Sequence, residues 1–472
     1  MRIINFKRLK YDLALCLSAT FLLAFPACRA QRQRPNILVI MTDQQSASMM
    51  SCTGNPWLKT PALDNLAANG FRFTQAYCTN PVCCPSRFSL QTGLFPSAIG
   101  MRENGDRHVD TAEVKTLLGT SLGNTLKAGG YQTYYGGKVH LPVTGIPITS
   151  WGYELLTTDE RDGLAAACRD FLLSRKKDAS PFLLVASFIN PHDICYDAIR
   201  WAEPESNLAR HTPADLDPAL SLPQGVSRQE FFRVYCPPLP SNHMPMIGVP
   251  DAEDSLISLR PFRKIVRQQW TEEDWRLHSW AYMRLTERAD SLIGIVLAAL
   301  KKSGLAENTV VIFTSDHGDN NGSHKLEHKT VFYEEASNIP LIISTPRMRR
   351  RGHVDSIHLV SNGLDLLPTL CDLAGIEPPP GLAGRSLKPL IDGDYSGSWR
   401  KYLFLENQIG DMVRTTRYKY EKDLMGKQRE MFVDLRRDPG ETRNLVSDPS
   451  YNLVVDSLRS VLTAHLVGLR SK

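Results

Sequence analysis

The clearest structural signal in the chain is Asn36-Ile37-Leu38-Val39-Ile40-Met41, a nearly continuous apolar run that ends at Thr42-Asp43-Gln44-Gln45. A run of this kind predicts a β-strand buried on both faces, as in a parallel sheet. Residues 182–189 run in the same way into Asn190-Pro191-His192-Asp193, and residues 309–313 run into Thr314-Ser315-Asp316-His317-Gly318. Because open α/β sheets place their sites at the carboxyl ends of the strands, we expect these polar segments to meet.

Helical patterns separate the expected strands, at residues 61–69, 121–128, 163–175 and 275–302. The alternation predicts an α/β fold, a large doubly wound mixed sheet flanked by helices. From about residue 398, strand-like runs at 401–406, 412–420 and 430–435 precede an amphipathic helix at 449–469. This order predicts a smaller C-terminal subdomain, an antiparallel sheet with a helix, and hence domains at 31–397 and 398–472.

Residues 1–30 have the pattern of a secretory signal peptide, with a basic start and an apolar stretch at 13–25 that is short for a bilayer. We therefore expect export to the periplasm or the medium, and no transmembrane segment after cleavage. Cleavage after Ala30 is favoured over a lipid anchor at Cys28. The segment carries a net charge of +4, so the net charge of +5 falls to +1 in the exported chain. No nucleic-acid partner is expected from so small a charge.

The most specific motif is Cys83-Cys84-Pro85-Ser86-Arg87-Phe88-Ser89-Leu90-Gln91-Thr92-Gly93. It resembles, at every fixed position, the signature C-x-P-S-R-x-x-L-x-T-G of the formylglycine-dependent sulfatases of the alkaline phosphatase superfamily. Pro85 and Ser86 also suit the first turn of a helix, whose free N–H groups favour an anion. The resemblance implies that a maturation enzyme oxidises Cys83 to formylglycine (3-oxoalanine).

The chemistry of sulfate esters explains why an aldehyde serves better than a serine. A serine would end as a second stable sulfate ester. The hydrated aldehyde has one hydroxyl that attacks sulfur and another that collapses to the carbonyl and expels sulfate, so one hard step becomes two easier ones. The resemblance therefore implies a sulfuric ester hydrolase.

The same resemblance extends over nearly the whole exported chain and implies a metal site. Asp43 and Gln44 match the first ligand pair of the family, where many members have two aspartates, and Asp316 and His317 match the second pair. Residue 83 would complete the coordination. Oxygen donors of this kind suit Ca²⁺, with Mg²⁺ as the alternative.

Four basic residues complete the resemblance: Lys138 and His140 in Gly137-Lys138-Val139-His140, His192 in Pro191-His192-Asp193, and Lys329 before Tyr333-Glu334. Alternation along a strand would place Lys138 and His140 on one face. Arg87, Lys138 and Lys329 would stabilise the negative charge of the transition state. His140 would take a proton as the aldehyde re-forms, and His192 would protonate the leaving oxygen.

Two other functions stay open at this point, a phosphonate or phosphate ester hydrolase of the same superfamily and a glycan-binding protein in which Cys83 is never oxidised. The Pro-rich residues 194–270 lack long periodic elements and predict a loop over the site. Arg260, Arg263, Lys264 and Arg267 in that segment could hold an anionic sugar. We therefore expect a sulfated saccharide as substrate.

Overall fold

The predicted strands form the centre of a mixed sheet. The computed structural model describes residues 34–143, 145–177, 179–346 and 348–470, and the chain from Pro35 onward forms one unit. The eight strands lie in the order β5-β4-β6-β1-β7-β8-β2-β9. Their bounds are β1 Asn36–Asp43, β2 Phe71–Phe73, β4 Gln132–Gly137, β5 Glu154–Thr157, β6 Phe182–Pro191, β7 Thr309–Ser315, β8 Leu341–Ser344 and β9 His353–Asp355.

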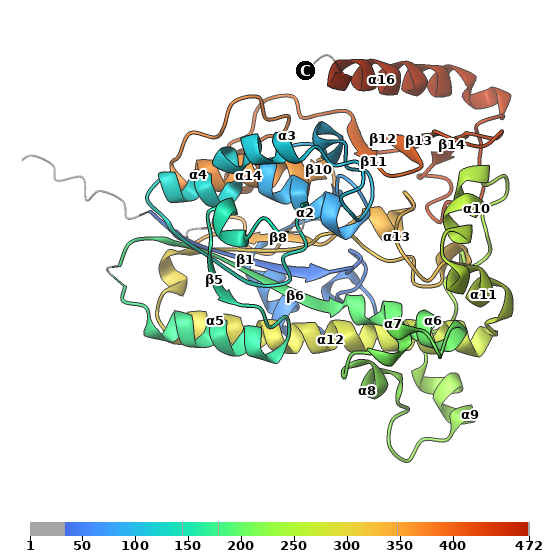
Figure 1. Ribbon diagram of the computed structural model, residues 1–472, viewed down its shortest axis with the longest axis horizontal. Coiled ribbons are helices and arrows are strands. Elements are labelled where there is room, and N and C mark those ends of the chain that lie inside the picture. The colour runs from blue at the N-terminus through green and yellow to red at the C-terminus, as the bar shows by residue number, and fades with distance from the viewer. Residues whose placement is uncertain (1–33, 144, 178, 347, 471–472) are drawn as a thin grey trace, which may run out of the picture. The chain divides into compact units, whose positions relative to one another are not determined.

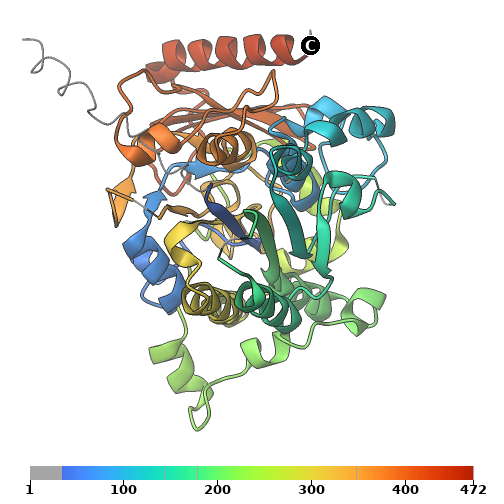
Figure 2. The same cartoon turned by 90° about the vertical axis from the view of Figure 1, so that its left-hand side faces the viewer.

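Strand β1 lies parallel to both β6 and β7, whereas β8 is antiparallel to β7. Alternate residues of the strands face different helix layers, which is why every residue of β1 is buried. One layer contains α1 Pro61–Asn69, α5 Asp162–Ser174 and α12 Glu272–Lys302, which pack on residues such as Leu38 and Ile40. The other contains α2 Cys83–Thr92, α4 Leu122–Ala128 and α14 Asn362–Ala374, which pack on Ile37 and Val39. Figures 1 and 2 show the sheet between the two layers, so the predicted doubly wound architecture is confirmed.

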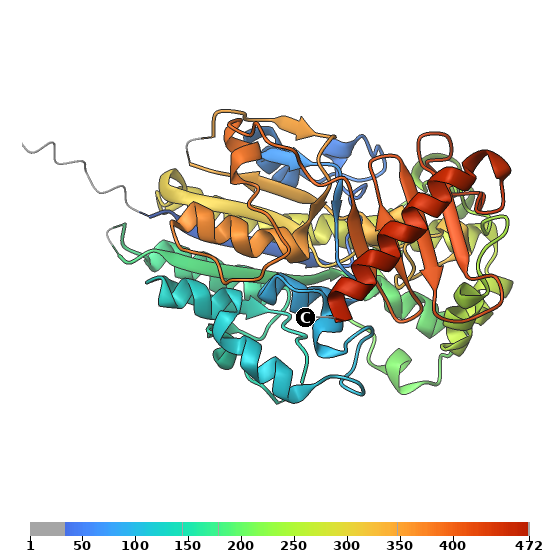
Figure 3. The ribbon, with the colours of Figure 1, turned by 90° about the horizontal axis from the view of Figure 1, so that it is seen from above.

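The C-terminal part contains the predicted antiparallel sheet and helix. Strands β11 Leu403–Glu406, β12 Gly410–Arg414, β13 Tyr418–Asp423 and β14 Glu430–Asp434 pair in sequence order, and helix α16 Asn452–Arg470 lies across them (Figure 3). The single strand expected at 412–420 is wrong. A turn at Thr415 divides it, because the Thr415 side chain accepts hydrogen bonds from the backbone of Arg417 and Tyr418.

The segment 194–270 is not the long loop expected from its prolines. It folds into short helices: α6 Cys195–Ala202, α7 Asn207–Arg210, α8 Leu216–Leu220, α9 Arg228–Glu230, α10 Asp251–Ser258 and α11 Pro261–Gln269. Pro250 and Pro261 stand at the starts of α10 and α11, where proline costs no hydrogen bond, whereas Pro237, Pro238 and Pro240 lie in the irregular stretch before α10. Buried aromatic residues hold the segment on α12, with Trp270 packed against Trp275.

The remaining described elements are short: β3 Ala76–Tyr77, β10 Val360–Ser361, α3 Thr111–Leu117, α13 Glu334–Ser337 and α15 Lys388–Asp392. All eight cysteines in the described ranges are free thiols. Among the helices described, none is long and apolar enough to cross a membrane. The expected signal peptide and Cys28 lie outside the described residues.

Candidate functional site

Helix α2 places Cys83 at its first turn, against the carboxyl ends of β1 and β7. The helix begins at Cys83, so Pro85 lies in the first turn as predicted, and it ends at Gly93, whose φ of 69° suits glycine. Cys83 is 1% exposed. Its thiol therefore lies inside the protein, at the edge of the sheet where the sequence predicts a site.

Four residues bring ligand atoms within 4.8 Å of one another: Asp43, Cys83, Asp316 and His317. The pairing of β1 with β7 explains this cluster, because Thr42 lies opposite Ser315, so Asp43 and Asp316 follow at the same edge of the sheet. Cys83 Sγ is 3.1 Å from His317 Nε2 and 3.7 Å from Asp43 Oδ1. His317 Nδ1 donates a hydrogen bond to the Gly318 carbonyl at 2.9 Å, which turns Nε2 toward the cluster.

These donors fit a divalent cation. Two carboxylates and an imidazole converge on one point, and the Cys83 sulfur stands where an oxygen of the oxidised residue would stand. Every one of the four residues is buried, and carboxylates buried together call for a cation. The cluster alone does not choose between Ca²⁺ and Mg²⁺.

Gln44, the fifth predicted ligand, borders the cluster. Its backbone N–H donates to Asp316 Oδ1 at 3.1 Å. Its side-chain oxygen accepts a hydrogen bond from Lys329 Nζ, and its Nε2 donates to Asp319 Oδ2 at 2.5 Å. The Gln44 side chain therefore connects Asp319 to Lys329, and its backbone N–H binds Asp316. The role of Gln44 as a metal ligand stays a prediction.

Arg87 holds the two aspartates of the cluster in place. Its Nη2 donates to Asp43 Oδ2 and its Nε to Asp316 Oδ2, both at 2.8 Å. Its Nη1 donates to the Lys138 carbonyl at 2.8 Å and to Ser187 Oγ at 2.9 Å. Buried arginines need such complete pairing, so Arg87 is the organising cation of the site.

Lys138 also reaches the cluster, but not in the way the sequence suggested. Its Nζ is 2.6 Å from Asp43 Oδ2 and 4.0 Å from Cys83 Sγ. Strand β4 ends at Gly137, so strand alternation does not extend to Lys138 and His140. His140 has a φ of 44° and its side chain is exposed. The expectation that both residues share a strand face is wrong, and the catalytic role of His140 stays a prediction.

His192 faces the same thiol from the end of β6. Asp43 lies opposite Pro191 in the sheet, which brings the following residue to the cluster. Burial, together with the charges of Lys138 and Lys329, lowers the pKa of His192 to about 4, although a hydrogen bond with Cys83 opposes the shift. His192 Nδ1 is buried without a partner among the described residues. The site thus surrounds residue 83 with cations and one neutral imidazole.

The charges around Cys83 favour an anion. Burial and Asp43 raise the pKa of the Cys83 thiol, but Lys138, Lys329 and His317 outweigh them, and the pKa lies well below its usual value. Burial also raises the pKa of Asp43, yet Lys138 and other nearby cations bring it well below its usual range. A site that stabilises a buried thiolate suits the oxygens of a bound oxyanion.

Two residues of the site were missed in the sequence. Asp319 is fully buried and accepts the Gln44 amide, and Cys195 Sγ lies 3.8 Å from Lys329 Nζ. The stretch Asp316-His317-Gly318-Asp319 could have indicated Asp319, since it continues the polar end of a strand. A cysteine at the start of α6 gives no comparable signal.

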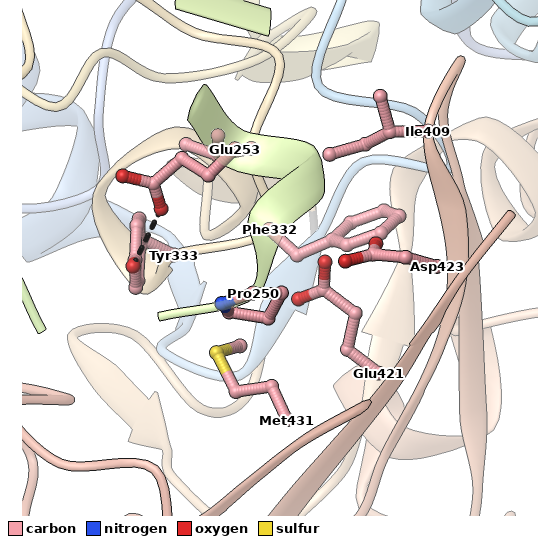
Figure 4. A pocket seen from close by; sticks show the side chains of 9 residues that line it. Pro250, Glu253, Phe332, Tyr333, Ile409, Glu421, Asp423 and Met431 are labelled. Carbon is pink, nitrogen blue, oxygen red and sulfur yellow. Dashed lines mark hydrogen bonds between the residues drawn. The ribbon is translucent and has the colours of Figure 1, made fainter. Parts of the chain in front are cut away.

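Another buried acidic group lies outside this site. Glu421 and Asp423 of β13 lie next to each other and face Glu253 of α10 across a cavity of about 10 Å³ (Figure 4). Tyr333 donates to Glu253 at 2.7 Å, whereas Asp423 has only the Glu421 carboxyl as a hydrogen-bond partner among the described residues. Burial raises the pKa of Asp423 to about 7.

Comparisons with known proteins agree with this geometry. The sequence pattern of the sulfatase family matches residues 35–376. A second pattern, the C-terminal part of N-sulphoglucosamine sulphohydrolase, matches residues 322–467. A Delta 4,5-hexuronate-2-O-sulfatase of Bacteroides thetaiotaomicron is 30% identical over 475 residues, 95% of this chain and 92% of that protein.

Two solved structures extend the comparison. A 2-O GAG sulfatase superposes with a TM-score of 0.78 at 27% identity, over 93% of each chain. The phosphonate monoester hydrolase of Agrobacterium radiobacter superposes with a TM-score of 0.66 at 21% identity, over 93% of this chain and 96% of that one. The second likeness shows a shared fold and no more.

Proposed function

The chain belongs to the sulfatase family and is a sulfuric ester hydrolase, and from this premise we propose that it hydrolyses sulfate esters of saccharides through an aldehyde made from Cys83. The observation that carries the proposal is the position of Cys83, buried at the first turn of α2 between two aspartates and Lys138. Its formylglycine form, when present, supplies the nucleophilic hydroxyl.

The chain's own residues would prepare that nucleophile and the substrate. Arg87 fixes both aspartates, and Asp43, Asp316 and His317 would hold a divalent cation, for which we propose Ca²⁺. Lys138 and Lys329 lie on either side of the site and would bind the sulfate oxygens. His192 would transfer a proton to the leaving oxygen, and exposed His140 would take one from the hydrated residue 83.

The saccharide substrate is supported by what the relatives act on. One is named for a hexuronate 2-O-sulfate and another as ulvan-active. We also propose that the signal sequence exports the chain to the periplasm or medium, where such glycans are met, and that a formylglycine-generating enzyme is its partner in maturation.

Mass spectrometry of the tryptic peptide that spans Cys83 tests the aldehyde. We expect formylglycine at residue 83 and an unchanged thiol at Cys84. An unmodified Cys83 in protein purified from its native source would overturn the mechanism and favour the glycan-binding alternative.

A substrate panel tests the reaction. Matured protein should release sulfate from sulfated saccharides faster than it cleaves 4-nitrophenyl sulfate, because contacts with the sugar contribute to reaching the transition state. Preference for a phenyl phosphonate monoester would favour the phosphonate hydrolase alternative. Elemental analysis of the same sample should find calcium.

A further inference from the structure

Helix α11 carries the four basic residues that the sequence offers for an anionic sugar, and the structure separates them. Arg260 and Lys264 are exposed to solvent. Arg267 Nη1 lies 3.4 Å from Glu253 Oε1, so its charge is paired. The side chain of Arg263 is only 13% exposed. Of the four, Arg263 alone is largely buried and has no acid within hydrogen-bond distance among the described residues.

Arg263 keeps all its hydrogen-bonding capacity. Its guanidinium donates to no described residue, and its Nε is sealed from solvent without a partner. Glu327 is the acid beside it, with Oε1 at 4.0 Å from Nε, too far for a hydrogen bond. Glu327 Oε1 has no hydrogen-bond partner either. An arginine has five N–H donors, and leaving a charged group unsatisfied in the interior is costly.

The position of Arg263 relates it to the candidate site. Helix α11 packs on α6, which begins at Cys195 (Figure 1). Cys195 Sγ is 3.1 Å from Gln44 Nε2 and 3.8 Å from Lys329 Nζ. Arg263 itself lies beside Glu327, which is two residues before Lys329 in the chain, and Cys195 is among the groups whose charge acts on it. Arg263 is thus on the side of the site where Lys329 lies.

Charge supports the same placement. Burial lowers the pKa of Arg263, while Glu327 and Cys195 oppose the shift. Burial and then Arg263 lower the pKa of His328, the neighbour of Lys329, to about 4. Burial raises the pKa of Glu327, but the nearby His328 and Arg263 outweigh burial and bring that pKa to about 2. Glu327 is thus a carboxylate that lets Arg263 stay buried yet leaves its donors free.

We propose that Arg263 binds a second anionic group of the substrate, a carboxylate or another sulfate on the sugar that carries the scissile ester. The inference rests on the proposed function, since it needs a saccharide substrate. A guanidinium suits this task because its planar fork binds a carboxylate or sulfate through two parallel hydrogen bonds. With Lys329 at the scissile sulfate, Arg263 would select sugars that carry a further negative charge.

Matched substrates test the proposal. Each hexuronic acid sulfate is assayed beside its methyl ester, and a disulfated hexosamine beside its monosulfate, so that the carboxylate and sulfate arms are separate. In each arm, the measured quantity is kcat/KM for the doubly charged sugar divided by kcat/KM for its singly charged counterpart. For Arg263→Ala, we expect this ratio to fall by about 10- to 100-fold in one arm, the range for a charged hydrogen bond. Arg263→Lys, which keeps the charge and loses the fork, should give a smaller fall.

Lys264→Ala is the matched control, since it removes an exposed charge one residue away on the same helix. It should keep both the ratio and the activity within about threefold. Arg263→Lys guards against a folding defect in the alanine variant, and thermal unfolding of each variant checks it.

The outcomes are distinct. An unchanged ratio in both arms, whatever the absolute activity, would make Arg263 a structural partner of Glu327 and overturn the inference alone. A wild-type protein that cleaves 4-nitrophenyl sulfate but none of these sugars would overturn the saccharide substrate and the role of Arg263 together.

Discussion

Two pairs of buried carboxylates in this protein differ in what surrounds them. Asp43 and Asp316 share one guanidinium, that of Arg87, and Lys138 lies 2.6 Å from the first. Glu421 and Asp423 are as deeply buried, yet neither has a cation within salt-bridge distance among the described residues. Burial raises the pKa of Asp423 to about 7, whereas the cations bring the pKa of Asp43 well below its usual range.

The difference shows that nearby cations oppose the effect of burial on a buried acid. They outweigh burial at Asp43, whereas burial and the neighbouring Asp43 raise the pKa of Asp316 in spite of Arg87. The second pair lies between β13 and α10 without such cations (Figure 4). Substitutions that exchange these surroundings test the comparison.

The largest effect on activity is expected at Cys83, which lies beside the charged pair Asp43 and Asp316. Cys83→Ala removes the precursor of the nucleophile, so sulfate release should fall by about 10⁴-fold or more, as for other enzymes that lose their nucleophile. Circular dichroism and the unfolding temperature should change little, because Cys83→Ala leaves only a small cavity.

Cys84→Ala is the matched control for this loss. Cys84 is buried on the same helix, and its backbone N–H rather than its thiol bonds Asn104. Most of the activity should therefore remain. If Cys84→Ala were inactive and Cys83→Ala active, residue 83 would not be the nucleophile.

Removing Arg87 should give the largest loss of stability. Arg87→Ala leaves the buried Asp316 without its guanidinium partner and leaves Asp43 with Lys138 alone, so the free energy of unfolding should fall by about 3 to 5 kcal/mol. Urea denaturation of metal-free protein measures it. Arg228→Ala is the control, because Arg228 pairs with Glu273 at the surface, where the two side chains are 58% and 48% exposed, and it should cost less than about 1 kcal/mol. Equal losses would mean that the two aspartates do not depend on Arg87.

The sequence revealed one of these pairs and not the other. Asp43 and Asp316 each follow a long apolar run, so the strands and their polar ends are visible locally, and the resemblance assigned Cys83, Arg87 and Lys138. Glu421 and Asp423 stand in a short alternating strand, where acidic residues usually face solvent. Their burial depends on α10, a helix from the distant segment 194–270, which the sequence suggested to be a loop.

His140 and Cys195 show the same limit within the site. The position of His140 depends on where β4 ends, and strand ends are set by pairing with neighbours and not by local pattern. Cys195 contacts Gln44 because β6 ends beside β1 and leads through residues 192–194 into α6. Contacts between distant segments are thus what the sequence could not supply.

Glu421 and Asp423, the pair without a nearby cation, should make the free energy of unfolding depend on pH. Asp423 has a pKa of about 7 in the folded state against 3.8 ordinarily, so the folded protein keeps a proton that the unfolded chain has lost. Its stabilising contribution is complete below about pH 4 and is lost as the pH rises through about 7. Asp423→Asn removes the part of this dependence that belongs to Asp423 and leaves the part that belongs to Glu421, whose pKa burial also raises. Relative to wild type, its free energy of unfolding should therefore rise by about 2 to 4 kcal/mol between pH 5 and pH 8.5.

Asp254→Asn is the control for this measurement, since Asp254 is an exposed acid on α10 next to Glu253. Its difference from wild type should stay constant with pH. A constant difference for Asp423→Asn as well would mean that Asp423 is charged in the folded protein and has a cation that the described residues do not provide.

The smallest effect is expected from a substitution that gives the candidate site two carboxylates that face each other, as Glu421 and Asp423 do. Gln44 Nε2 donates to Asp319 Oδ2 at 2.5 Å. Gln44→Glu replaces this donor by an acceptor, so two buried carboxylates would face each other, with only the Lys329 ammonium on the far oxygen as compensation. In metal-free protein we expect a loss of about 1 to 3 kcal/mol at pH 8, the cost of a buried acceptor without its donor. Below about pH 5 a shared proton restores the hydrogen bond, so the loss should shrink there.

Gln268→Glu, the same exchange at an exposed position of α11, should change stability little at either pH. Chemical denaturation at both pH values decides: no loss at pH 8 would mean that Asp319 is already protonated there and donates to the new carboxylate, so that the Gln44 amide does not hold it as a charged partner.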